Sequence, residues 1–180
     1  LPGHGTVPGD LLRAERMEWS RAVRWGIETF RGEVERLYAV GFSTGAALGI
    51  EAALEGAPFA GLILISPAVA VTPLAAFSRW HRALSWANAR GAWYELHADH
   101  DPVRFESLAH HAVHQVHALT LANRERLRAT RLTQSMLVVQ SEDDATVDAA
   151  AALRFFRAQH HPASRMLLCS RAKGIAGNDL

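Results

Sequence analysis

A serine flanked by two glycines is the residue whose surroundings point most directly to chemistry. The stretch Gly41-Phe42-Ser43-Thr44-Gly45 has the form G-x-S-x-G, with a buried-strand pattern directly before it and a small-residue helix pattern directly after it. That context predicts a sharp strand-to-helix turn that holds the Ser43 hydroxyl out at the carboxyl edge of a sheet. Gly41 and Gly45 leave out Cβ atoms that would clash with the turn. An ordinary Gly-Ser turn is the alternative, and the context favours Ser43 as a nucleophile.

A serine hydroxyl attacks a carbonyl only when a base takes its proton, and the usual base is a histidine oriented by a carboxylate. Where this motif joins a strand to a helix, the chain order is serine, then acid, then histidine. The acidic run Glu142-Asp143-Asp144 follows a strand pattern at 135–140 and therefore supplies the candidate acids. On chemical grounds alone, Asp143 and Asp144 are almost equally good candidates for the triad acid. The unused acids would be solvated or would cap the helix that we expect to begin near Val147.

The elements that must position these residues alternate between strand and helix patterns. Continuous apolar runs predict buried strands at 36–41, 61–67, 135–140 and 165–169. Apolar residues at helical spacing predict helices at about 10–31, 44–55 and 147–159. The fold class predicted is therefore α/β, with a mostly parallel sheet and flanking helices. Residues 1–70 and 131–180 form the two parts of the core, and the helix-rich residues 71–130 form an insertion.

Histidines cluster in the predicted insertion. His110, His114 and His117 lie at i, i+4 and i+7 and so share one helix face. Imidazoles at this spacing can bind Zn²⁺ or Ni²⁺, but no other fixed ligand is evident. We therefore interpret them as partly exposed residues of an insertion helix and predict no metal site.

Composition excludes several classes of function. The formal net charge of +1 provides no strong field to attract nucleic acid or an anionic membrane. No apolar run approaches the roughly 20 residues that a transmembrane helix needs, and no signal peptide pattern precedes the first loop. The single cysteine, Cys169, allows neither an intrachain disulfide nor a cysteine-rich metal site. We expect a cytoplasmic protein that binds a small molecule; the oligomeric state is open.

These motifs resemble the α/β-hydrolase superfamily, in its serine aminopeptidase-like, monoglyceride lipase-like and carboxylesterase-like branch. The loop Leu1-Pro2-Gly3-His4-Gly5 is similar to the P-x-x-G-H-G loop of that family, and Trp19 lies in the following helix, where a tryptophan is common. The resemblance implies an α/β-hydrolase fold in which residues 71–130 form a helical cap. Its aromatic side chains would either line an apolar pocket or pack onto the main domain. They are Trp80, Trp86, Trp93, Tyr94 and Phe105.

The same resemblance separates the two candidate acids. Family members often carry a glycine after the strand, an acid three residues later and a valine three residues further on. Ser141, Asp144 and Val147 take these places in this chain. The resemblance therefore makes Asp144, rather than Asp143, the triad acid.

The chain departs from the family pattern at two functional positions. One oxyanion donor is the N–H of the residue after the nucleophile, here Thr44. The other comes from a His-Gly loop after an early strand, and we expect it before residue 1. No histidine follows the last predicted strand, Arg165–Cys169, although Lys173 falls near the place where one would stand. We expect the catalytic histidine beyond residue 180, so none is assigned, and the 180-residue chain alone should lack normal turnover.

The resemblance implies a serine hydrolase that cleaves a carboxylic ester, lipid monoesters included, through an acyl-enzyme intermediate and without a cofactor. An amide or peptide hydrolase of the same fold is the alternative within this class. A non-catalytic α/β-hydrolase scaffold that binds ligands or partners is the alternative from another class, and the absent histidine motivates it.

Overall fold

The computed structural model describes residues 1–70, 89–95, 97, 107–159, 161–171 and 174–178. Its α-helices are α1 (Arg16–Thr29), α2 (Thr44–Leu54), α5 (His110–Ala129) and α6 (Ala149–Gln159). Its strands are β1 (Leu37–Phe42), β2 (Phe59–Ile65), β3 (Trp93–Glu95), β4 (Leu108–Ala109), β5 (Ser135–Ser141), β6 (Arg165–Ser170) and β7 (Gly174–Asn178). Two 3₁₀ helices, η1 (Pro8–Leu12) and η3 (Ala89–Ala92), complete the elements of these residues.

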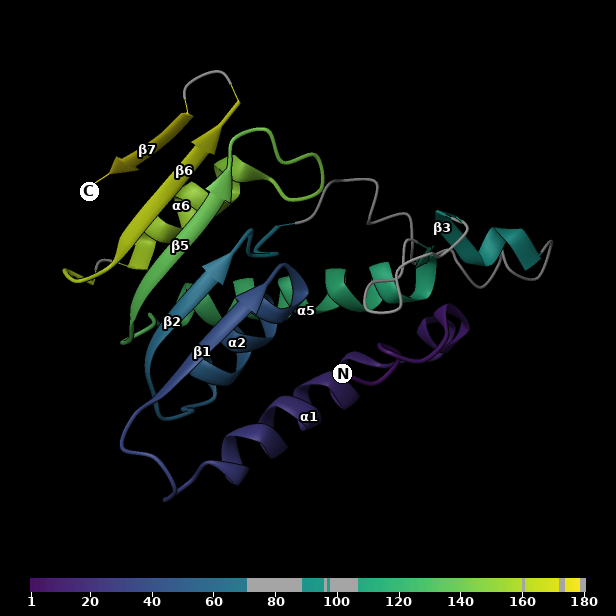
Figure 1. The fold of residues 1–180 in the computed structure, drawn as a ribbon, viewed down its shortest axis with the longest axis horizontal. Helices are drawn as coiled ribbons and strands as arrows, with labels where there is room; N and C mark the ends of the chain where they lie inside the picture. Colours follow the sequence, from purple (N-terminus) through teal and green to yellow (C-terminus); the bar gives the residue numbers. More distant parts are fainter. Residues whose placement is uncertain (71–88, 96, 98–106, 160, 172–173, 179–180) are drawn as a thin grey trace. The chain divides into compact units, whose positions relative to one another are not determined.

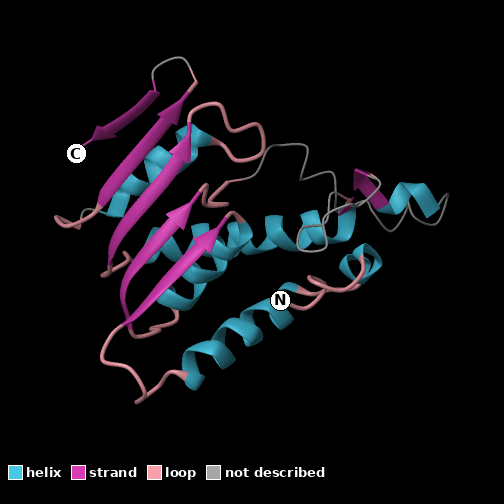
Figure 2. Ribbon diagram, in the orientation of Figure 1, coloured by secondary structure: helices cyan, strands magenta, loops and turns pink. Residues whose placement is uncertain are grey.

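A five-stranded sheet in the order β1-β2-β5-β6-β7 organises the larger part of the described chain (Figures 1 and 2). The pairs β1–β2, β2–β5 and β5–β6 are parallel, which confirms the predicted α/β class. β7 pairs antiparallel with β6 at a place where the sequence predicts no strand. Parallel strands end at the same edge of the sheet, so the segments after β1, β2 and β5 share one edge.

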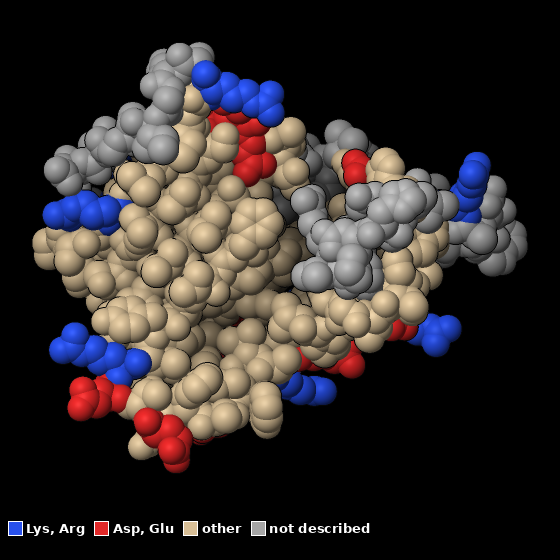
Figure 3. All heavy atoms as spheres, viewed as in Figure 1, with Lys and Arg blue, Asp and Glu red and all other residues tan. Residues whose placement is uncertain are grey.

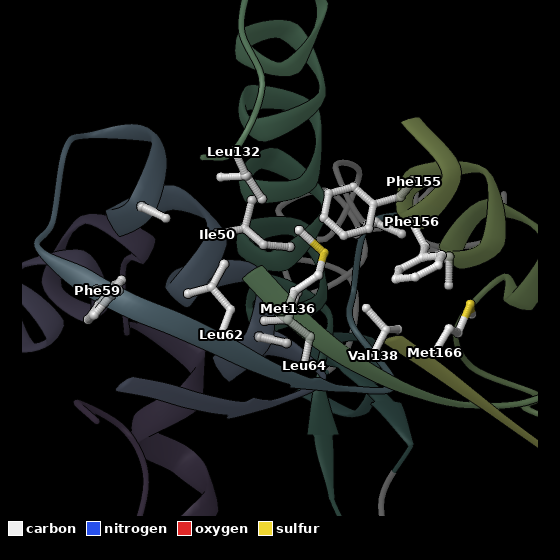
Figure 4. Packing of buried hydrophobic residues seen from close by; sticks show 14 of the residues in the cluster. Ile50, Phe59, Leu62, Leu64, Leu132, Met136, Val138, Phe155, Phe156 and Met166 are labelled. Carbon is white, nitrogen blue, oxygen red and sulfur yellow. The ribbon is translucent and has the colours of Figure 1, made fainter. Parts of the chain in front are cut away.

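The buried side chains form one core on one face of this sheet (Figure 4). Leu64 near the end of β2 and Val138 at the centre of β5 are fully buried. α2 approaches the sheet closely because Ala46 and Ala47 at its start are small and fully buried. α6 contributes a stripe at helical spacing that includes Phe155. The labelled members in Figure 4 are Ile50, Phe59, Leu62, Leu64, Leu132, Met136, Val138, Phe155, Phe156 and Met166.

The opposite face of the sheet is apolar but exposed at β1. Tyr38, Val40 and Phe42 alternate with residues of the core face and are 53%, 67% and 65% exposed. The face turned toward the viewer in Figure 3 is largely free of charged side chains at its centre. β1 lies at one edge of the sheet, so its outer backbone groups have no neighbouring strand within the described residues.

The helix predicted over residues 10–31 is wrong as a single element, because it is divided into η1 and α1. The Asp10 carbonyl accepts both Arg13 N–H and Ala14 N–H, which closes a tight turn after η1. A new helix then starts, with the Glu18 carboxylate accepting the Glu15 N–H at 2.9 Å. That bond is the backbone half of a capping box, and it fixes the beginning of α1.

The chain divides into two compact units: residues 1–22 with 72–118, and residues 23–71 with 119–180. In the first, the loop at Leu1–Gly5 is held to α1, since Trp19 Nε1 donates to the Pro2 carbonyl at 2.9 Å. The same unit contains the short antiparallel pair β3–β4. Residues 71–88, 96 and 98–106 of the predicted cap lie outside the described residues, Trp80, Trp86 and Phe105 among them. The cap assignment stays a prediction.

Candidate active site

The predicted strand-to-helix turn at Ser43 is confirmed. Ser43 joins the end of β1 to the start of α2 with φ 50° and ψ −110°, outside the regions that side chains with a Cβ ordinarily occupy. Its N–H donates to the Ile65 carbonyl at 2.9 Å. Its carbonyl accepts Ala47 N–H and Ala68 N–H, each at 3.2 Å. Three backbone hydrogen bonds therefore hold the serine in a strained conformation, which persists only where the surroundings over-determine it.

The space available for a side chain differs between the two flanking glycines, Gly41 and Gly45. A Cβ on Gly41 would lie 2.5 Å from Ala46 N and from Gly45 C, so the turn closes against it only if residue 41 has no side chain. A Cβ on Gly45 would meet no heavy atom within 4 Å among the described residues. The clash predicted at Gly41 is thus confirmed, and the clash predicted at Gly45 is not found among the described residues, because a Cβ there would contact none of them on the first turn of α2.

The glycine pair gives a matched test of the turn. Gly41→Ala is expected to lower the free energy of unfolding by about 3 kcal/mol or more, because backbone atoms have to move to admit the methyl group. Gly45→Ala is expected to raise it by about 0.5–1 kcal/mol, since alanine is the better helix former. Urea unfolding of both variants measures this. Equal losses at the two positions would contradict the geometry of the turn.

Thr44 is the first residue of α2, so its N–H has no acceptor within the helix. Backbone N–H groups at a helix start also lie at the positive end of the helix dipole. The turn therefore presents a donor beside the Ser43 hydroxyl, where negative charge develops on a carbonyl oxygen that the serine attacks.

Asp144 follows β5 on the same sheet edge as Ser43, with β2 between their strands. One carboxylate oxygen, Oδ1, accepts Thr146 N–H at 2.9 Å and Val147 N–H at 3.0 Å. The other, Oδ2, accepts Gln140 Nε2 at 3.3 Å. The side chain of Ser66, just after β2, is a further hydrogen-bonding group that lowers the pKa of the same carboxyl. Asp144 is therefore a half-buried acid with donors on both oxygens.

The carboxyl of Asp144 is stabilised as the anion. Partial burial raises its pKa, but hydrogen bonds from Val147, Thr146, Ser66 and Gln140 outweigh this and hold the pKa below its ordinary value of 3.8. An acid that stays ionised at neutral pH is what orienting a histidine and stabilising an imidazolium requires.

Asp143 has different surroundings. Its side chain is exposed, and its Oδ2 accepts the Arg171 N–H, just after β6, at 2.8 Å. The cap of the following helix is a residue that the sequence interpretation did not single out. Asp148 Oδ1 accepts Ala151 N–H at 2.9 Å, and α6 begins at Ala149 rather than near Val147.

The match to a family model covers nearly the whole chain. Residues 1–169 match the model described as the alpha/beta hydrolase family. This chain belongs to that family. The match spans the elbow, the acid and the strands that bring them to one edge.

Solved structures with the α/β-hydrolase fold are similar to this chain at low identity. One comes from a study of LipS and LipT, two metagenome-derived lipolytic enzymes, with a TM-score of 0.76 and 19% identity over 93% of this chain and 69% of that one. A monoacylglycerol lipase of Paleococcus ferrophilus has a TM-score of 0.71 and 16% identity over 95% and 71%. A soluble variant of monoglyceride lipase from Saccharomyces cerevisiae has a TM-score of 0.61 and 14% identity. That match covers 86% of this chain and 59% of the lipase. No curated protein sequence matches this chain.

Two neighbouring histidines of the described residues have contacts within the first compact unit. His110, at the start of α5, contacts the Tyr94 ring edge-on with centroids 5.5 Å apart. His111 Nε2 lies 3.4 Å from a Glu15 carboxylate oxygen. Among the described residues, no group of three His, Cys, Asp or Glu side chains is arranged to hold a metal ion. None of the described helices has the length and apolar character to cross a membrane.

Two residues of the site were missed by the sequence interpretation: Ser66 and Gln140. Ser66 follows β2 and Gln140 is the last but one residue of β5, so both lie at the edge where parallel sheets bind ligands, and that position is the signal that could have found them. Ser66 also has a positive φ of 41°. Gln140 is four residues before Asp144, whereas Ser66 follows a different strand, so no single sequence motif contains all three residues.

The lowered pKa of Asp144 predicts acid sensitivity. A carboxyl whose pKa is depressed by folding contributes stability above its unfolded pKa and loses that contribution as the pH falls through the folded pKa. Asp144→Asn is expected to be less stable than the original chain at neutral pH, because an amide cannot accept from every donor present. The difference should stay constant down to about pH 5 and shrink below the ordinary value of 3.8. Urea unfolding as a function of pH measures it, and a difference independent of pH would contradict the assignment.

Proposed function

We propose that this α/β-hydrolase is a serine hydrolase that cleaves a carboxylic ester through an acyl-enzyme intermediate. The observation that carries the proposal is the strained backbone of Ser43 at the β1–α2 turn. This turn is so tight that position 41 has no room for a side chain and is occupied by glycine. Strain of this kind is retained at functional sites, and this turn is the one that exposes a nucleophilic serine.

In the proposed reaction, Ser43 Oγ forms a bond with the ester carbonyl carbon while its proton passes to a histidine. Asp144, ionised and held by its donors, orients that histidine and stabilises its charged form. Thr44 N–H donates to the oxyanion. The alcohol leaves with the proton, and water then hydrolyses the acyl-serine ester and restores Ser43. No cofactor takes part.

Esters with a medium apolar acyl group, lipid monoesters included, are the substrates we propose. The support is the similarity in fold to lipolytic enzymes and to monoglyceride lipases from two organisms. Amide or peptide cleavage by the same residues is the alternative. A non-catalytic scaffold is favoured by one observation, the absence of histidine from residues 170–180.

A substrate panel tests the proposal. The full-length protein is assayed with aryl esters of increasing acyl length, with a monoacylglycerol and with matched amides. We expect the esters to be cleaved with the higher kcat/KM and a covalent acyl-serine to appear by mass spectrometry before steady state. The 180-residue chain alone, lacking a histidine after β6, is expected to be nearly silent, because losing a triad member leaves only about 10³–10⁴-fold over water. Preference for the amides favours the alternative, and no turnover in the full-length protein favours the scaffold.

A further inference from the structure

Ser66 lies beside Ser43 in the sheet but is not part of the elbow. The register pairs Phe42 with Ile65, so the residues that follow them, Ser43 and Ser66, leave neighbouring strands at the same level. Ser66 N–H donates to the Val139 carbonyl of β5 at 2.8 Å. Ser66 therefore bridges from β2 toward the strand that leads to Asp144.

The backbone of Ser66 is strained as well. Its φ is 41°, and the next residue is Pro67. A side chain with a Cβ disfavours positive φ, and a following proline favours extended backbone instead. Glycine would adopt this conformation at less cost. The sequence nevertheless has a residue with a hydroxyl here, and hydrogen bonding by that side chain lowers the pKa of the Asp144 carboxyl.

Gln140, the second residue near Asp144, is the last but one residue of β5 and has no exposed surface. Its Nε2 donates to the Ser141 carbonyl at 3.0 Å and to Asp144 Oδ2 at 3.3 Å. The reversed amide would place its oxygen against these two acceptors, so the orientation is fixed. Its Oε1 is buried and accepts no hydrogen bond from the described residues. A buried acceptor without a partner costs about 1–3 kcal/mol. An apolar residue of the same shape would avoid that cost but would remove the donor to Asp144.

Both side chains thus keep a locally unfavourable feature and both bring a donor to one carboxylate. We propose that Ser66 and Gln140 are positioning residues that fix the orientation and the ionised state of the Asp144 carboxylate. The catalytic consequence rests on the proposed function. The two backbone N–H groups donate only to Oδ1 of this carboxylate. Ser66 and Gln140 add the side-chain donors that restrain the carboxylate from rotating.

The test compares Ser66→Ala, Ser66→Gly and Gln140→Met with Ser164→Ala. Ser164 is the control, because its buried hydroxyl accepts Met136 N–H at the opposite end of β5. The pKa of Asp144 is followed by carbon NMR of labelled aspartate, with the resonance assigned from Asp144→Asn. We expect that pKa to rise in the first three variants and to stay unchanged in Ser164→Ala.

Stability and turnover separate positioning from folding. Ser66→Gly should melt at a higher temperature than Ser66→Ala, because glycine relieves the positive φ, although both lack the hydroxyl. In the full-length enzyme both should lower kcat for an ester by about 10- to 100-fold, with a smaller change in KM. Gln140→Met should lower kcat to a similar extent without a matching loss of stability.

An Asp144 pKa that is unchanged in the Ser66 variants would overturn the proposal, and so would a raised pKa with unchanged kcat. Equal effects of Ser164→Ala would also overturn it, because the response would then be general. The pKa measurement needs no turnover. If turnover survives Ser43→Ala, the proposed function fails, and the pKa series alone still decides whether Ser66 and Gln140 hold the carboxylate.

Discussion

Ser43→Ala is expected to lower kcat of the full-length protein for an ester by about 10⁴-fold or more, with the fold intact. Losing the nucleophile of a serine triad removes the covalent route altogether, and only the oxyanion donors and substrate binding still accelerate the reaction. The methyl group of alanine fits where the serine Cβ stands, so the turn itself is undisturbed. Steady-state kinetics and the disappearance of the acyl-enzyme peak measure the loss.

Ser43→Gly serves as the companion variant, because it separates strain from chemistry. Glycine adopts φ 50° and ψ −110° with less strain than a residue that has a Cβ. Ser43→Gly is therefore expected to be as inactive as Ser43→Ala but more stable than the original chain, by about 1 kcal/mol. A glycine variant that loses both activity and stability would contradict a strained turn retained for catalysis. Substantial turnover in either variant would remove Ser43 from the proposed reaction.

The parts of the fold that sequence predicted are those where one local pattern suffices. A buried-strand pattern, the motif at Gly41–Gly45 and a small-residue helix pattern follow one another directly in the sequence, and together they are typical of one strand-to-helix turn. For that reason the strand-to-helix turn could be predicted with its residue numbers. The same holds for β5 and β6, whose apolar runs are continuous.

The sequence interpretation failed where non-local or capping contacts decide the structure. Apolar residues at helical spacing continue through residues 10–31, so this pattern does not reveal the break before α1 that the Glu18 carboxylate and the Glu15 N–H mark. β7 contains glycine and alanine rather than an apolar run, and its place comes from pairing with β6.

The surroundings of the acid were the least predictable part of the site. Ser66 comes near Asp144 only because the parallel register aligns the ends of β2 and β5, and Gln140 reaches Asp144 from four residues earlier in the chain. Sequence chemistry left Asp143 and Asp144 nearly even, and the resemblance alone separated them. The contacts of the two carboxylates now give the choice a physical basis that kinetics can test.

Asp144→Asn is expected to lower kcat of the full-length protein by about 10⁴-fold, and Asp143→Asn by less than about tenfold. The Asp144 carboxylate lies at the sheet edge that it shares with Ser43, is half-buried and has a lowered pKa, so it can hold a histidine in one tautomer. An amide at 144 leaves the shape in place but loses the charge that stabilises the imidazolium. The exposed Asp143 carboxylate binds the Arg171 N–H instead, so its loss should cost stability rather than turnover.

The two substitutions are matched controls for one another, because they make the same chemical change at neighbouring positions. Kinetics are measured together with urea unfolding, so that the folded fraction of each variant is known when its kcat is compared with that of the original protein. Asp143→Asn should lower stability by about 1 kcal/mol through the lost charge on its hydrogen bond to Arg171 N–H. If instead Asp143→Asn is the inactive variant and Asp144→Asn is active, the alignment through Ser141 and Val147 is displaced by one residue. The triad acid is then Asp143, and Asp144 is a structural turn residue whose donors serve only the fold.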